Sequence, residues 1–201
     1  MTADSTPVTP PEPTHLLFRA ERKLAAGSLA TLVQTLHGFS PAEREGVLIF
    51  EVATGRELDV DLRGTAQDLT RRYPPASTSV DDAPAPRKRG RPKLGVVGRE
   101  VTLLPRHWQW LDTQRGGASA ALRRLIDQAR KEFAGEDAAR AAQDRTNRLL
   151  TTLAGNLPGF EEAIRALYAR DQVGFEHQLS SWPVDLRDTA LQFANDVWPP
   201  L

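Results

Sequence analysis

The sequence contains no cysteine, which excludes disulfides, thiolate metal sites, iron–sulfur clusters and a cysteine nucleophile together. No apolar run approaches the roughly 18 residues that a membrane helix needs. Residues 1–13 are polar and proline-rich and lack the basic start and apolar stretch of a signal peptide. We therefore expect a cytoplasmic protein without a membrane partner.

The chain also lacks an excess of charge of either sign, because 26 basic residues balance 26 acidic residues. The total charge therefore indicates nothing about partners, and only its distribution along the chain can. With 201 residues, of which 40% are hydrophobic, the chain is long enough for one or two compact domains with some linker.

Proline content and apolar spacing divide the chain into five segments. We predict a disordered tail over 1–13, a small α+β domain over 14–73, a Pro-rich basic linker over 74–98, a strand–helix–turn–helix segment over 99–134, and a helical C-terminal region over 135–201. The predicted fold class is therefore α+β.

The α+β domain is predicted from local patterns. We expect strands over 15–19 and 22–26, a helix that Gly27 opens, a β-hairpin with arms 47–52 and 57–62, and a short helix over 65–73. The second hairpin arm alternates, with Leu58, Val60 and Leu62 on one face. The C-terminal helices should be interrupted at 155–158, near Gly174, and at 182–183.

Basic charge is concentrated in the linker. Residues 87–99 contain six basic residues and no acidic residue, although the protein as a whole is neutral. Concentrated positive charge favours binding to a phosphate backbone. The segment is therefore either a nucleic-acid contact or a solubilising basic linker.

The run Arg89-Gly90-Arg91-Pro92 resembles the AT-hook, a short peptide that lies in the minor groove of A·T-rich DNA. Two arginines can reach along a narrow groove where the potential is most negative, and A·T pairs lack the guanine amino group that would block them. Gly90 lets the backbone approach the groove floor, and Pro92 keeps the chain extended. The residues expected to meet flanking phosphates are Arg87, Lys88 and Lys93.

Residues 99–133 resemble a ribbon-helix-helix DNA-binding domain, in which two chains pair one strand each and the ribbon enters the major groove. The matching features are a β-prone stretch over 99–104, Pro105 at the start of a short helix, a turn at Gly116-Gly117, and Ser119 as N-cap of a longer helix. The resemblance implies a homodimer and a phosphate contact at Ala118 and Ser119. The alternative is a structural helical hairpin, and we weigh the two equally.

The strand of this segment departs from the family pattern. In the family, apolar residues alternate up to the proline and polar residues face the bases, but that register would place Glu100, Thr102 and Leu104 inward. Since a shift of one residue turns every side chain over, either the strand contains a bulge or base reading is weak. Including this strand, the residues expected to bind DNA are Arg87, Lys88, Arg89, Gly90, Arg91, Pro92, Lys93, Arg99, Thr102 and Ser119.

Three stretches resemble a bacterial family known only as domain of unknown function 2239. They are residues 48–64 with the turn Ala53-Thr54-Gly55-Arg56, residues 89–111, and residues 157–163. The resemblance covers nearly the whole chain and implies no catalytic residue. It suggests that the hook-like run and the helical pair belong to one unit.

The sequence offers little basis for catalysis. Asp59 and Asp61 share one strand face, but the solvated side of a half-buried strand explains them better than an acid–base pair does. Four histidines lie far apart without metal-ligand spacing, and neither a phosphate-binding loop nor a dinucleotide motif is present. We expect no enzymatic activity, no cofactor and no metal.

The sequence therefore favours a DNA-binding protein, either a transcription regulator or a nucleoid-associated factor, with A·T-rich double-stranded DNA as partner. The alternative is a protein–protein interaction module whose basic linker only steers it towards an acidic surface.

Overall fold

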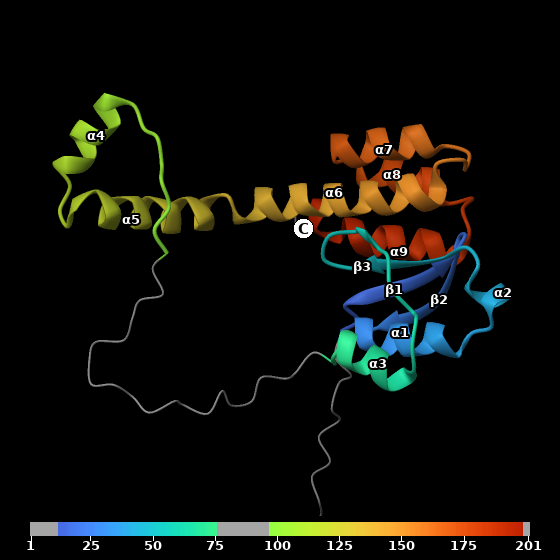
Figure 1. Ribbon diagram of the computed structural model, residues 1–201. Coiled ribbons are helices and arrows are strands. Elements are labelled where there is room, and N and C mark those ends of the chain that lie inside the picture. Colours follow the sequence, from blue (N-terminus) through green and yellow to red (C-terminus); the bar gives the residue numbers. More distant parts are fainter. Residues whose placement is uncertain (1–11, 76–96, 199–201) are drawn as a thin grey trace, which may run out of the picture. The chain divides into compact units, whose positions relative to one another are not determined.

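The computed structural model describes residues 12–75 and 97–198 and confirms the α+β class (Figure 1). The chain forms two compact units. Residues 1–77 and 136–201 make the first, which we call the sheet unit, and residues 78–135 make the second, which we call the helix-pair unit. Among the described residues, no helix is both long enough and apolar enough to cross a membrane.

The sheet unit is built around a four-stranded antiparallel sheet with the order β2-β1-β3-β4. The central strand β1 pairs with β2 on one side and with β3 on the other, so that His15 lies opposite both Gly27 and Glu51. The strands are β1 (His15–Arg19), β2 (Arg22–Gly27), β3 (Val47–Glu51) and β4 (Glu57–Leu58).

One face of the sheet is covered by N-terminal helices. Because side chains alternate along a strand, Leu17 and Ile49 point to this face, where they pack with Leu32 and Leu36 of α1. Hydroxyl side chains cap the helices on this side, and Ser28 accepts a hydrogen bond from the Thr31 N–H. The helices that precede the linker are α1 (Leu29–Gly38), α2 (Pro41–Arg44) and α3 (Ala66–Arg72).

The other face of the sheet is covered by the C-terminal helices. Leu16, Phe18 and Phe50 are buried there in one core with residues such as Leu149 and Phe193. The Phe18 and Phe50 rings meet edge to face, with their centroids 6.2 Å apart. The helices are α6 (Ala134–Ala154), α7 (Phe160–Ala169), α8 (Gln172–Leu179) and α9 (Val184–Ala194), followed by a 3₁₀ turn (Asn195–Val197).

This shared core changes the organisation expected from the sequence, which treated 14–73 and 135–201 as separate segments. The sheet has two apolar faces, and the N-terminal segment supplies helices for only one of them. The C-terminal helices therefore complete the fold that β1 begins, and the helix-pair unit is inserted between the two halves of the sheet unit.

In the sheet unit most predicted elements are confirmed, but three details differ. The second hairpin arm ends at Leu58, because the backbone around Asp61 bonds to α3: the Asp61 N–H donates to Tyr73 Oη (2.9 Å) and Arg72 Nη1 donates to the Asp61 carbonyl (2.6 Å). The break expected near Gly174 lies before α8, where Asp171 accepts a hydrogen bond from the Gly174 N–H. Helix α2 was not anticipated.

The turn between β3 and β4 packs directly on α6. Arg148 Nη1 donates to the Thr54 carbonyl at 2.8 Å. Gly55 has φ +66°, and a Cβ built on it would lie 2.8 Å from Arg145 Cα and overlap the Arg145 carbonyl. Both the left-handed backbone and the close approach require glycine at this position.

We expect a fragment of residues 14–73 not to fold alone, in contrast to what the sequence suggested. Separation from the C-terminal helices exposes Leu16, Phe18 and Phe50, at a cost of roughly 2 kcal/mol for each side chain. Far-ultraviolet circular dichroism of the fragment should show an unfolded chain. Addition of a fragment of residues 136–201 should restore structure, and a native-like spectrum of 14–73 alone would contradict the shared core.

The Gly55→Ala substitution should destabilise the protein much more than Gly46→Ala. Both glycines have positive φ, but a Cβ at Gly46 would meet nothing within 4 Å. Gly46→Ala should cost about 1 kcal/mol of backbone strain, whereas Gly55→Ala should cost roughly 3 kcal/mol or more because α6 must also move. Thermal unfolding checks this, and equal midpoints for the two variants would show that the turn does not press on α6.

Candidate nucleic-acid interface

The described part of the helix-pair unit consists of an extended stretch, two helices and a glycine turn. Residues 97–104 form neither helix nor strand. Pro105 begins α4 (Pro105–Asp112), where its missing N–H costs nothing, and α5 (Gly117–Glu132) follows after a turn. Gly116 and Gly117 have φ of +87° and +74°, which explains why two glycines stand there.

Hydrogen bonds from side chains to the backbone hold this turn together. Thr113 Oγ1 donates to the Trp110 carbonyl at 2.7 Å, and Arg124 Nη1 reaches back from α5 to the Arg115 carbonyl at 3.2 Å. The angle between α4 and α5 is therefore supported by polar contacts as well as by packing.

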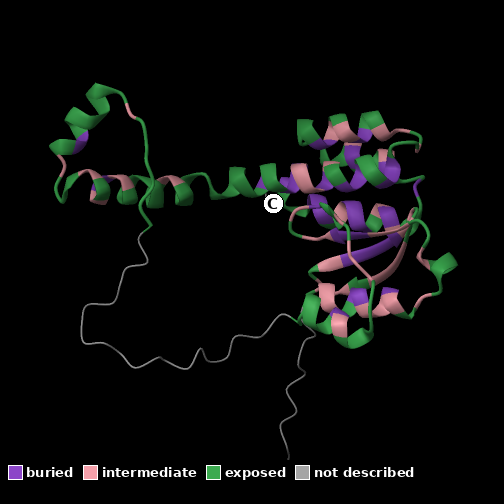
Figure 2. Ribbon diagram, in the orientation of Figure 1, coloured by how far each residue is buried: buried purple, intermediate pink, exposed green. Residues whose placement is uncertain are grey.

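The helix-pair unit buries very little. Among its described residues only Leu111 and Ala121 are buried, each 2% exposed. Most of the ribbon of this unit has the green colour of exposed residues in Figure 2. The exposed residues include large apolar side chains on both helices and on the extended stretch. They are Val97, Val101, Leu104, Trp108, Trp110, Leu125, Ile126 and Phe133. Large exposed apolar side chains of this kind are candidates for burial against a partner.

Both tryptophans of α4 are exposed, Trp108 by 39% and Trp110 by 50%. Since they lie two residues apart, they point in different directions from the helix, and neither is enclosed by α5.

On α5 the apolar residues form one continuous face. The spacing of three and four residues places Leu122, Leu125, Ile126, Ala129 and Phe133 on one side of the helix. This face contacts little within the chain, since Ile126 is 55% exposed and Phe133 is 49% exposed.

The predicted strand over 99–104 is not formed in the single chain. The strands that pair in the described part of the protein all lie between His15 and Leu58. A ribbon of the predicted kind exists only between two chains, so that one chain leaves the stretch without a neighbour.

The predicted DNA contacts have different outcomes. Arg99 and Thr102 are exposed on the extended stretch, and Ser119 is exposed in the first turn of α5. Ser119 does not cap α5, because the helix begins two residues earlier and Gly116 takes the cap position. The hook-like run, Arg87 to Lys93, lies outside the described residues.

Basic residues on α5 were overlooked by the sequence reasoning. The polar side of the helix carries Arg123, Arg124, Arg130 and Lys131, all exposed. The sequence pattern that could have revealed them is a pair of basic residues, 123–124, followed by a second pair seven positions later, 130–131. Seven positions correspond to about two helical turns.

The distribution of charge between the two units is very uneven. Residues 78–135 contain 12 basic and 6 acidic residues, whereas the rest of the chain contains 14 basic and 20 acidic residues. The neutral protein therefore combines a helix-pair unit of net charge +6 with a sheet unit of net charge −6. Within this pattern only the basic linker stands out in the sequence.

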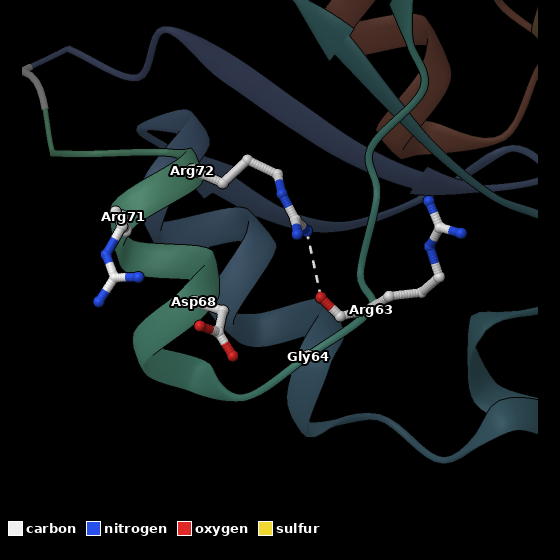
Figure 3. Close-up of a pocket in the computed structure, with 5 residues that line it drawn as sticks. All are labelled: Arg63, Gly64, Asp68, Arg71 and Arg72. Carbon is white, nitrogen blue, oxygen red and sulfur yellow. Dashed lines mark hydrogen bonds between the residues drawn. The ribbon is translucent and has the colours of Figure 1, made fainter.

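A second group of arginines lies in the sheet unit, at a shallow pocket lined by Arg63, Gly64, Asp68, Arg71 and Arg72 (Figure 3). The Arg72 side chain donates to the Arg63 carbonyl at 3.1 Å. Arg63 binds both carboxylate oxygens of Asp61, at 2.9 and 3.0 Å, and these hydrogen bonds hold the pKa of that carboxyl well below its usual range. Asp61 thus holds the chain segment before α3 in place.

The described residues hold no group of three or more histidine, aspartate or glutamate side chains arranged to bind a metal ion. The arrangement that remains for a function is the exposed apolar and basic surface of the helix-pair unit.

One of three comparisons with known proteins gave a match. Searches of the curated proteins and of the solved structures each gave no significant match. A family model described as "Uncharacterized protein conserved in bacteria" matches residues 14–194, which include most of the described residues of both units. The chain belongs to this bacterial family, DUF2239.

Proposed function

We propose that the protein binds double-stranded DNA as a homodimer, with the helix-pair unit and the basic linker as its DNA-binding part. The observation that carries this proposal is the separation of charge, because 12 basic and 6 acidic residues fall in 78–135 within a neutral chain. A cation-rich unit of this kind gains affinity for a duplex by releasing counterions from its phosphates. Such a protein would serve as a transcription regulator or a nucleoid-associated factor.

The second copy is expected from the lack of a core in the helix-pair unit. A domain of about 40 residues usually needs disulfides, a metal or oligomerisation to be stable. The chain has no cysteine, and the described residues hold no metal cluster. A second copy would cover the apolar face of α5 and would pair its own extended stretch with residues 99–104.

Dimerisation would also strengthen DNA binding by the hook-like run, which binds weakly as a single copy. A dimer carries two basic linkers, so the binding of one hook raises the effective concentration of the other near the same duplex. In this arrangement Arg89 and Arg91 read A·T richness in the minor groove, while the paired stretches bearing Arg99 and Thr102 lie against the major groove. Ser119, at the start of α5, would contact a phosphate.

Light scattering at micromolar concentration should therefore give twice the 22.2 kDa mass of one chain. The Ile126→Asp substitution should weaken the dimer by at least about 30-fold, because a charge would be buried in the centre of its apolar face. The matched control is Val173→Asp on α8, an apolar residue that is 78% exposed in the sheet unit, and this variant should remain a dimer. A monomeric wild-type protein would contradict the dimer.

Replacement of both Arg89 and Arg91 by alanine should remove most of the preference for A·T-rich duplex. These two side chains flank Gly90 and would reach the groove floor, so their loss should affect A·T-rich DNA more than G·C-rich DNA. Mobility shifts with the two duplexes at two salt concentrations measure this. The control Lys93→Ala should weaken binding to both duplexes equally and lower the salt slope by about one.

Two results would count against this assignment. If the double variant weakened binding to both duplexes by the same factor, the linker would be a basic patch without groove chemistry. If the wild-type protein bound neither duplex, the exposed surface would instead belong to a protein-binding module.

A further inference from the structure

The polar side of α5 is a row of basic side chains that the proposed groove contacts do not use. It carries Arg123, Arg124, Arg130 and Lys131, and Asp127 is the acidic residue that lies among them. All of these side chains are exposed. The net charge of this surface, which we call the α5 basic face, is therefore +3.

The four cations are arranged in two matching pairs. Arg130 follows Arg123 by seven residues, and Lys131 follows Arg124 by seven residues, so each pair spans two helical turns, or about 10.5 Å. This distance corresponds to about three base-pair steps of 3.4 Å, measured along the duplex axis. A rigid helix thus presents positive charge at a spacing that can follow a phosphate backbone.

Other charged groups do not neutralise this face. The ion pairs of the described residues involve none of its four cations, whereas Arg63, Arg145 and Arg148 in the sheet unit each pair with an aspartate. The Arg124 guanidinium is positioned by the Arg115 carbonyl, which accepts its hydrogen bond and leaves its charge intact. Cations without an acidic partner are available to an external anion.

The α5 basic face also points away from the apolar face. At about 100° per residue, the centres of the two faces lie roughly 150° apart around the helix. A second copy that covers Leu125, Ile126 and Phe133 would therefore leave the basic side chains open to solvent. Dimerisation and anion binding use different sides of the same helix.

We propose that the α5 basic face binds the phosphate backbone of duplex DNA, as a contact surface separate from the linker and from the paired stretches. This inference rests on the proposed function and adds to it a sequence-independent site on α5. A dimer has two copies of this surface, so each protomer can contact the phosphate backbone.

The test compares two double variants that remove the same charge. Arg130→Ala with Lys131→Ala removes two cations from the α5 basic face, and alanine favours the helix. Arg140→Ala with Arg165→Ala removes two exposed arginines from α6 and α7 of the sheet unit, where they pair with Asp137 and Glu162. Affinity for A·T-rich and G·C-rich duplexes is measured over a range of salt concentrations.

The α5 variant should lower the salt slope by about 1.8, that is 0.9 for each phosphate contact, on both duplexes. Affinity at 0.1 M salt should fall on the order of 50-fold, with the ratio between the two duplexes unchanged. The control should keep the wild-type slope. Light scattering should show that both variants remain dimers, because neither touches the apolar face.

Other outcomes would overturn the inference in distinguishable ways. If the wild-type protein binds DNA and the α5 variant has the same salt slope, the α5 basic face does not contact DNA. The proposed function is retained in that case. Tighter binding by the α5 variant would mean that the face holds the acidic sheet unit of a chain instead of DNA. A wild-type protein that binds neither duplex would reject both proposals.

Discussion

The structure depends on a sheet with two apolar faces. Leu17 and Ile49 point to one side and Leu16, Phe18 and Phe50 to the other, and a sheet of four short strands is stable only when both sides are covered. The N-terminal helices follow the strands closely in sequence and cover the first side. The second side is covered by helices that begin after residue 133. The N-terminal and C-terminal segments must therefore share one core.

This constraint explains the position of the helix-pair unit. Since both ends of 78–135 lead back into the sheet unit, the stability of the fold comes from elements outside this insertion. The insertion is then free to expose side chains that a domain with its own core would bury, such as Trp110 and Ile126. An element that contributes little to the core can keep an incomplete apolar face for a partner.

Local sequence patterns predicted most elements because the interactions that form them are local. The apolar spacing of Leu29, Leu32 and Leu36 indicated α1, and the apolar run over 47–52 before the turn at Gly55 indicated β3. The shared core could not be predicted in this way, because it brings Phe18 and Phe50 together with Phe193, which follows them by more than 140 positions. The cap of α5 was misplaced because Ser119 has good capping chemistry, while the positive φ of Gly116 depends on the turn.

The basic residues of the candidate site could also be predicted only in part. The linker charges stand out in the sequence because they are consecutive, whereas those on α5 are separated by apolar residues and become one surface only when the helix forms. The opposite charges of the two units cancel in the total, yet salt screens exposed charges beyond about 8 Å at physiological ionic strength. On the proposed function, a duplex bound to the helix-pair unit would meet a unit of net charge +6, although the whole protein is neutral. Net charge describes this protein poorly, because binding at close range depends on how the charge is divided.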